Sequence, residues 1–176
     1  IAWFHCASLG EFEQGRPIIE AFKVDFPQYK ILLTFFSPSG YEIRKNYEGA
    51  HFIYYLPMDT VKNAAQFLKI VKPKLAIFVK YEFWYNYIHQ LKINNIPAYL
   101  VSANFRENQI FFKKYGSFFR KIIFNFDHIF VQNSNSQKLL KGIGYEYITV
   151  AGDTRFDRVF KLSNQKKILP KIEHFK

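Results

Sequence analysis

The chain has 176 residues, of which 49% are hydrophobic and 20% aromatic, so it can bury the core of one domain and is not a disordered polypeptide. Lysine and arginine number 25 against 14 acidic residues, and the net charge of +11 favours an anionic partner: nucleic acid, a phosphorylated substrate or a membrane surface. The single cysteine, Cys6, excludes an internal disulfide, and no apolar run reaches the ~20 residues that span a bilayer.

Short apolar runs alternate with helical patterns along most of the chain, as expected of parallel βαβ units. Strands are predicted at Ile1–His5, Lys30–Phe35, Phe52–Tyr55, Leu75–Val79, Ala98–Val101, His128–Val131 and Tyr147–Val150. Helices are predicted at Phe12–Phe26, Gly40–Tyr47, Val61–Val71, Trp84–Asn94, Ile110–Phe124 and Ser134–Lys141. We therefore expect an α/β fold, a Rossmann-like parallel sheet with right-handed crossovers and helices on both faces.

The end of the chain has a different composition. After Asp157 it becomes rich in lysine and asparagine, and Leu162–Lys176 is predicted to be a linker or a last helix whose partner is missing. We expect a domain over 1–157 and the start of a linker over 158–176. Because the only methionine is Met58 and the first residue already fits a strand, we expect a fragment of a longer protein rather than a processed form.

The segment from Phe111 to Ile123 is amphipathic at the helical period of ~100° per residue. Its apolar face carries Phe111, Phe112, Tyr115, Phe118, Phe119, Ile122 and Ile123. Its other face carries Lys113, Lys114, Ser117, Arg120 and Lys121. A basic amphipathic helix can lie at an anionic membrane interface, but we favour a helix that packs its apolar face into the core.

The first strand ends at Ser8-Leu9-Gly10 and is followed directly by Glu11. In open α/β sheets, ligands bind beyond the carboxyl ends of the strands, which makes Glu11 a candidate acid/base group. The alternative is an acid in the first turn of a helix, where it complements the helix dipole. Cys6, just before this turn, is interpreted as a small buried side chain rather than a nucleophile.

Three further loops follow predicted strands and should converge on the same edge of the sheet. Ser37-Pro38-Ser39-Gly40 could hold a phosphate or a sugar hydroxyl at a helix start, although either serine could equally be a helix N-cap. Lys80-Tyr81-Glu82 offers a second carboxylate next to a cation, and it leads into Phe83-Trp84-Tyr85-Asn86. Ser102-Ala103-Asn104-Phe105-Arg106 is the fourth loop.

Several familiar chemistries have no motif in this sequence. It contains no G-x-G-x-x-G, no Walker A and no G-x-S-x-G segment, and its five histidines do not have metal-ligand spacing. We therefore expect no metal site and no cofactor. Two carboxylates with basic and hydroxyl neighbours indicate group transfer onto a hydroxyl.

Four motifs resemble, in order and spacing, the amino-terminal half of 3-deoxy-D-manno-octulosonic acid (Kdo) transferases. They are His5-Cys6-Ala7-Ser8-Leu9-Gly10-Glu11, Thr34-Phe35-Phe36-Ser37-Pro38-Ser39-Gly40, Tyr81-Glu82-Phe83-Trp84-Tyr85-Asn86 and Gly152-Asp153-Thr154-Arg155-Phe156-Asp157. The resemblance implies a two-domain GT-B fold. It also implies transfer of Kdo from CMP-Kdo to a lipid A precursor, with inversion and without a metal, in lipopolysaccharide synthesis.

The resemblance also implies roles for single residues. Glu11 matches the glutamate proposed as general base, and Glu82 matches a second acid of the family. This chain has Tyr85 where the family has a proline and Arg155 where it has a lysine, so the charge at 155 is retained but the geometry of the donor is not. We expect Glu11 and Glu82 to be catalytic. The expected acceptor-binding residues are Ser8, Gly10, Ser37, Ser39, Gly40, Lys80, Asn86, Asn104, Arg106 and Arg155.

The implied partners are a lipid A precursor, an anionic membrane surface and CMP-Kdo, the last held by a domain outside this chain. The implied location is the cytoplasmic face of the bacterial inner membrane, and the fragment alone is expected to be inactive. Three rivals remain: a basic nucleic-acid-binding domain, another GT-B enzyme or sugar-nucleotide epimerase, and a non-catalytic scaffold at membranes. Against nucleic acid, the aromatic residues follow the periodicity of a core, and we expect no nucleic-acid partner.

Overall fold

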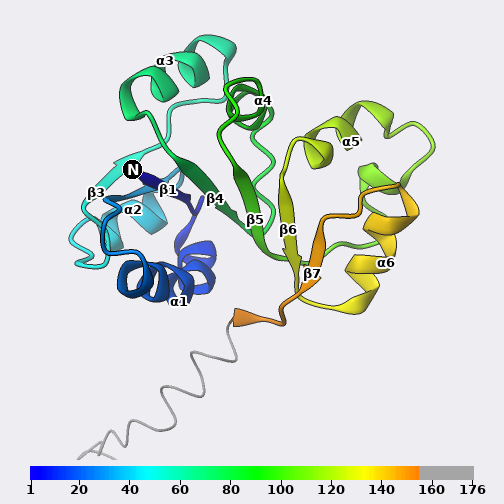
Figure 1. Cartoon of the computed structure of the whole chain (residues 1–176), viewed down its shortest axis with the longest axis horizontal. Coiled ribbons are helices and arrows are strands. Elements are labelled where there is room, and N and C mark those ends of the chain that lie inside the picture. Colours follow the sequence, from blue (N-terminus) through cyan, green and yellow to red (C-terminus); the bar gives the residue numbers. More distant parts are fainter. Residues whose placement is uncertain (155–176) are drawn as a thin grey trace, which may run out of the picture.

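The computed structural model describes residues 1–154, and these form one seven-stranded parallel sheet in the order β3-β2-β1-β4-β5-β6-β7 (Figure 1). The strands are β1 (Ala2–His5), β2 (Ile31–Phe35), β3 (Phe52–Tyr55), β4 (Leu75–Val79), β5 (Ala98–Ala103), β6 (His128–Val131) and β7 (Ile148–Val150). The chain moves outward from β1 to β3, then returns to β4 on the other side of β1. The α/β fold expected from the sequence is confirmed.

Helices join the strands and cover both faces of the sheet (Figure 1). They are α1 (Leu9–Asp25), α2 (Pro38–Arg44), α3 (Val61–Val71), α4 (Tyr85–Ile93), α5 (Ser117–Phe124) and α6 (Ser134–Gly142), with a short 3₁₀ helix at Ile110–Phe112. One core packs α1 against β1, β2 and β4, and a larger core packs α3, α4, α5 and α6 against the opposite face. The central strands are therefore buried on both faces, which is why they appear in the sequence as unbroken apolar runs.

The predicted helix over Ile110–Phe124 is wrong in its first half. After the 3₁₀ helix, Lys113 is extended with φ −84° and ψ 151°, and α5 begins only at Ser117. A tight turn explains the break, because a Cβ on Gly116 would lie 1.8 Å from the carbonyl oxygen of Ile110. The apolar stripe is therefore divided between the core, where Ile122 is buried, and the surface, where Tyr115 is exposed.

Other differences from the sequence prediction are small but affect the site. Helix α1 begins at Leu9, three residues before the predicted start, so Glu11 lies in its first turn. Strand β5 continues to Ala103 through an irregularity, and Ser102 has a left-handed φ of 54°. Within residues 1–154 no helix is both long and apolar enough to cross a membrane.

Candidate active site at the carboxyl edge of the sheet

The loops that follow β1, β2 and β4 come together at the carboxyl edge of the sheet, as the sequence predicts. The backbone N–H groups of Phe36 and Ser37 both donate to the carbonyl of Ala7, at 3.1 and 2.7 Å. The Lys80 ammonium lies 3.6 Å from a carboxylate oxygen of Glu11. We call the group formed by Ser8, Glu11, Ser37, Lys80 and Glu82 the edge site.

Glu11 is held by two neighbours and is still accessible to a ligand. Its Oε2 accepts a hydrogen bond from the hydroxyl of Ser8, and its Oε1 faces the Lys80 ammonium. The side chains of Glu11 and Lys80 are 17% and 31% exposed, so both can meet a bound molecule. Lys80 has a left-handed φ of 74°, a conformation that non-glycine residues rarely adopt and that is concentrated at functional sites.

The serine loop has the geometry of a helix cap. The Ser37 hydroxyl accepts a hydrogen bond from the Ser39 N–H at 3.3 Å, and the two hydroxyls are 2.9 Å apart, so the N-cap interpretation is confirmed. Gly40 acts through packing, because a Cβ there would lie 2.3 Å from the Phe35 ring and 3.0 Å from the backbone of Ser8. Gly10, in contrast, is exposed and has space for a Cβ.

Glu82 is more firmly held than Glu11. Its Oε2 accepts a 2.6 Å hydrogen bond from the Trp84 indole and lies 3.3 Å from Nε2 of His5. The His5 side chain is fully buried and that of Glu82 is 12% exposed. Glu82 therefore presents a fixed carboxylate at the edge of the sheet.

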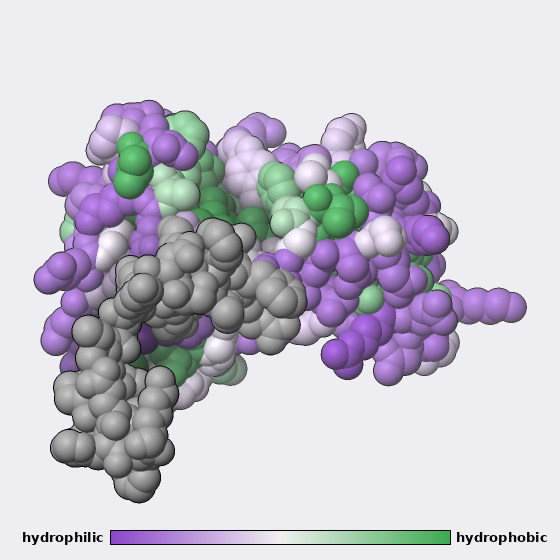
Figure 2. Space-filling view, turned by 90° about the horizontal axis from the view of Figure 1, so that it is seen from below, coloured by the Kyte–Doolittle hydropathy of each residue, from purple (hydrophilic) through white to green (hydrophobic). Residues whose placement is uncertain are grey.

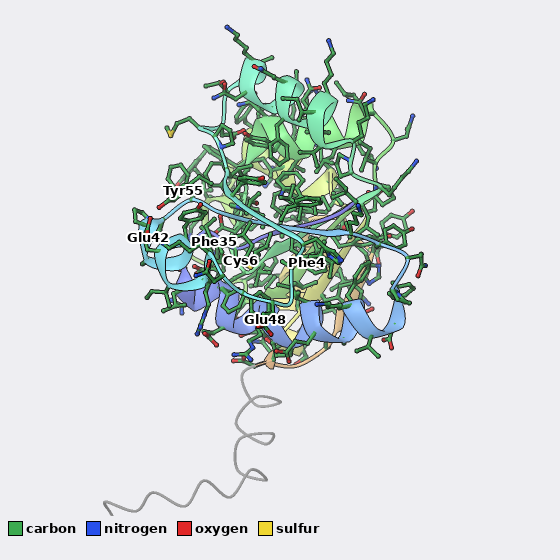
Figure 3. All side chains as sticks on the ribbon, turned by 90° about the vertical axis from the view of Figure 1, so that its left-hand side faces the viewer. Phe4, Cys6, Phe35, Glu42, Glu48 and Tyr55 are labelled. Atoms are coloured by element: carbon green, nitrogen blue, oxygen red, sulfur yellow. The ribbon has the colours of Figure 1, made fainter. Side chains whose placement is uncertain are left out.

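Cys6 is buried in the same core cluster as Phe35, and the two residues lie close together in Figure 3. Burial raises the pKa of the Cys6 thiol well above its ordinary value, and the charges of Glu82 and Glu11 raise the pKa further. A protonated, buried thiol is a poor nucleophile. The sequence interpretation of Cys6 as a small buried side chain is confirmed.

Two further predicted acceptor-binding residues, Asn86 and Asn104, have hydrogen-bond partners outside the edge site. The Asn86 amide donates to the carbonyl of Asp59 at 3.0 Å, while the Asp59 carboxylate accepts the backbone N–H groups of Asn86 and Tyr87 at 3.1 and 3.3 Å. The side-chain oxygen of Asn104 accepts from Asn133 at 3.0 Å. Their acceptor-binding role stays a prediction.

Two predicted acceptor-binding residues remain, Arg106 and Arg155. The side chain of Arg106 is exposed, and its backbone N–H donates to Gln109 at 2.9 Å. Arg155 lies outside the described residues. Asp59, which caps α4, was missed by the sequence interpretation because its partners are 27 and 28 residues away. Among residues 1–154 no three His, Cys, Asp or Glu side chains are grouped so that they could hold a metal ion.

A model of the family described as 3-deoxy-D-manno-octulosonic-acid transferase (kdotransferase) matches residues 1–158. The chain belongs to this family. A 3-deoxy-D-manno-octulosonic acid transferase of Haemophilus influenzae is 31% identical over 177 residues, which cover 97% of this chain and 40% of the relative. That of Aquifex aeolicus is also 31% identical, over 88% of this chain and 40% of its own length. The chain thus spans about two fifths of these two Kdo transferases.

Several solved structures similar to this chain are epimerases, and they show the fold alone. A UDP-GlcNAc 2-epimerase from Neisseria meningitidis, bound to UDP-GlcNAc, superposes with a TM-score of 0.69 at 12% identity over 98% of this chain and 52% of its own. A UDP-N-acetylglucosamine 2-epimerase from Rickettsia bellii gives a TM-score of 0.66 at 16% identity, over 98% and 50%. The Rossmann-like fold of this Kdo transferase family member therefore corresponds to half of each epimerase.

Proposed function

We propose that this chain is the acceptor-binding part of a glycosyltransferase that moves Kdo from CMP-Kdo to a lipid A precursor in lipopolysaccharide synthesis. The observation that carries the proposal is the edge site itself. Two carboxylates, Glu11 and Glu82, lie at the carboxyl ends of β1 and β4 in a chain that belongs to the Kdo transferase family. The donor would be held by a part of the protein outside this chain, and the fragment alone would be inactive.

In the proposed reaction Glu11 acts as general base. Its carboxylate takes the proton of an acceptor sugar hydroxyl while that oxygen forms a bond to the anomeric carbon of Kdo. The bond between this carbon and the phosphate oxygen of CMP breaks on the opposite face, and CMP leaves with the electron pair. The configuration is inverted, and no metal or cofactor is required.

The neighbours of Glu11 fit this role. The Ser8 hydroxyl orients one carboxylate oxygen, and the Lys80 ammonium is 3.6 Å from the other, near enough to complement the charge of the base or of a phosphate on the acceptor. Ser39 and Gly10 are also exposed, and a Cβ on Gly10 would meet only the Ser8 hydroxyl, at 3.7 Å. Glu82 would orient the acceptor by accepting a hydrogen bond from another of its hydroxyls.

A membrane surface is the proposed location of the acceptor, at the cytoplasmic face of the inner membrane. Tyr115 and Phe118 are 75% and 54% exposed, and Lys114 and Lys121 are exposed on the same segment. The Phe118 ring is 5.7 Å from that of Tyr85, at the start of α4, which directly follows the Glu82 loop. Aromatic and lysine side chains together suit an anionic bilayer interface.

The face of the molecule that is seen from below is mainly hydrophilic, with separate apolar patches (Figure 2).

The decisive experiment is a transfer assay with CMP-Kdo and a lipid A precursor on the longer protein that carries this chain. We expect Glu11→Gln to lower kcat by about 10²–10⁴-fold, the range of general acid–base catalysis. Glu20→Gln is the matched control. Glu20 lies on the same helix as Glu11, but its carboxylate pairs with Arg16, at 2.7 Å, and not with a residue of the edge site. Transfer at the wild-type rate by the Glu11 variant would remove this residue from the mechanism.

A further inference from the structure

A buried hydrogen-bonded chain lies behind Glu82. Strands β1 and β2 pair in parallel with His5 opposite Thr34, and Trp3 precedes His5 on the same face of β1. All three side chains are fully buried. The Trp3 indole N–H donates to the Thr34 hydroxyl oxygen at 2.8 Å, and this oxygen lies 2.9 Å from Nδ1 of His5.

These contacts favour a proton on Nε2 of His5. An indole N–H can only donate, so the Thr34 oxygen accepts from Trp3 and keeps its own proton to give. Two acceptors are near that hydroxyl: Nδ1 of His5 at 2.9 Å and the Phe4 carbonyl at 3.4 Å. The 2.9 Å contact is the shorter one and favours Nδ1 as the acceptor, which places a ring proton on Nε2. A ring protonated on both nitrogens, with Nδ1 donating to Thr34 and Thr34 donating to Phe4, also carries a proton on Nε2, 3.3 Å from a carboxylate oxygen of Glu82.

The buried Nε2 atom has no well-aligned hydrogen bond, and the Glu82 oxygen 3.3 Å away is its charged neighbour. A buried N–H without a partner costs free energy, and an apolar side chain would fill this position without that cost. Trp84 donates to the same oxygen at 2.6 Å, and its ring stands at 90° to the imidazole with the centroids 5.1 Å apart. One oxygen of Glu82 is thus approached by two donors from inside the protein.

We propose that His5 is a positioning residue for Glu82. The Nε2 N–H of the His5 ring holds Oε2 of Glu82 and leaves Oε1 to accept a hydrogen bond from the sugar acceptor. The contact at 3.3 Å shortens when the acceptor binds, because catalytic hydrogen bonds are often long in ligand-free structures and tighten in the complex. This inference rests on the proposed function.

The first test compares two substitutions in the longer protein. His5→Leu removes the donor at similar volume, whereas His5→Gln places an amide N–H near the position of Nε2. We expect His5→Leu to lower kcat about 10²-fold, as a small misplacement of a reacting group does, and His5→Gln to restore most of this loss. His51→Leu is the matched control, because the His51 ring accepts the backbone N–H of Ile31 at 3.0 Å instead of facing Glu82. Equal losses in the two His5 variants would overturn the proposal.

The second test does not depend on activity or on the stability of a variant. Nitrogen-15 NMR of the labelled wild-type protein reports which ring nitrogen of each histidine is protonated. We expect Nε2 of His5 to carry a proton in the wild type, and Thr34→Val to let the proton exchange between the two ring nitrogens. Thr149→Val is the control, because Thr149 pairs with the half-buried His128 at 2.9 Å. A His5 ring protonated on Nδ1 alone would contradict the inference.

Failure of the inference and failure of the proposed function can be told apart. If Glu82→Gln transfers Kdo at the wild-type rate, the proposed role of Glu82 fails whatever the tautomer of His5. If Glu82→Gln is impaired and His5→Leu is not, only the positioning role fails. If both are impaired, the double variant should be no worse than Glu82→Gln, since residues that act as a unit are not additive.

Discussion

Two acids of the edge site differ in how firmly they are held, and this difference suits two tasks. Glu11 contacts a serine hydroxyl and a partly exposed lysine, both of which can rearrange around a substrate. Glu82 accepts a hydrogen bond from an indole and faces a fully buried imidazole, which has less freedom to move. The adaptable surroundings of Glu11 suit the proposed general base, which must take up a proton. The rigid surroundings of Glu82 suit a carboxylate that orients a sugar.

The sequence could predict those residues of the edge site that follow closely after the end of a strand. Glu11, Lys80 and Glu82 directly follow β1 and β4, so strand periodicity and one turn were enough to find them. The support of Glu82 could not be found in this way. His5 and Thr34 are 29 residues apart, and their contact depends on the register of β1 against β2, which no local pattern specifies.

The first residue-scale prediction concerns the reactivity of Cys6. Because burial and two nearby acids raise its pKa, the thiolate form should be scarce and inaccessible at pH 8. We expect an alkylating reagent to leave native Cys6 unmodified while modifying it fully in urea, as measured by intact mass. Rapid modification of the folded protein would show that the thiol is exposed or ionised.

At the scale of elements, the alternation of strands and helices was predictable from the sequence. The break in the predicted helix from Ile110 to Phe124 was not. Buried parallel strands and their connections leave a strong apolar pattern, and all seven predicted strands overlap observed ones. The segment from Ile110 to Phe124 has a helical period throughout, yet it is broken. The break depends on the contact of Gly116 with the Ile110 carbonyl, a property of the folded turn that the periodicity does not carry.

The second prediction tests how the first two loops are joined. An alanine at Gly40 would place its Cβ 2.3 Å from Phe35 and press α2 away from the Ser8 turn, so we expect Gly40→Ala to lower the free energy of unfolding by about 1–3 kcal/mol. The control is Gly10→Ala. Its Cβ would lie 3.7 Å from the Ser8 hydroxyl, so we expect no loss in the free energy of unfolding. Urea unfolding measures the free energy of both variants. If Gly40→Ala is as stable as Gly10→Ala, the packing of α2 does not require a glycine at position 40.

At the scale of the whole molecule, one half-buried tyrosine and two buried tyrosines link the free energy of unfolding to alkaline pH. Burial, with a smaller contribution from Glu20, raises the pKa of Tyr47 from 10.0 to about 12. Burial also raises the pKa of Tyr87 and Tyr145, where Asp59 and Asp127 add to it. A raised pKa in the folded state means that the protonated phenol stabilises the fold below pH 10.0, and that this stability is lost as the pH rises to about 12.

We therefore expect the free energy of unfolding to fall between pH 10 and pH 12, with about 1 kcal/mol of the fall from Tyr47 once its partial exposure is allowed for. Urea unfolding at several pH values measures it. Tyr47→Phe has no hydroxyl to ionise and should reduce the slope, while Tyr115→Phe, at a side chain 75% exposed, should not. If Tyr47→Phe leaves the pH dependence of the free energy of unfolding unchanged, other groups cause the loss of stability at alkaline pH.

The distribution of charge and apolar surface gives the last prediction. A net charge of +11 attracts the chain to anionic lipid, but charge alone does not choose an orientation. Tyr115 and Phe118 offer aromatic surface beside exposed lysines on the segment next to the Glu82 loop, so insertion there would place the edge site over the lipid. Replacing both with serine should weaken binding to vesicles of phosphatidylglycerol by about tenfold or more, given the apolar area removed.

The matched variant for this prediction is Phe124→Ser. Phe124 lies on the same helix and is 45% exposed, but its ring contacts Tyr145 at a centroid distance of 5.8 Å rather than the Glu82 loop. We expect it to bind vesicles as the wild type does. Salt should weaken binding of every variant through the shared charge, whereas only the loss of Tyr115 and Phe118 should weaken it at constant salt. If both serine variants bind alike, the apolar contact lies elsewhere, and charge alone would hold the protein to the membrane.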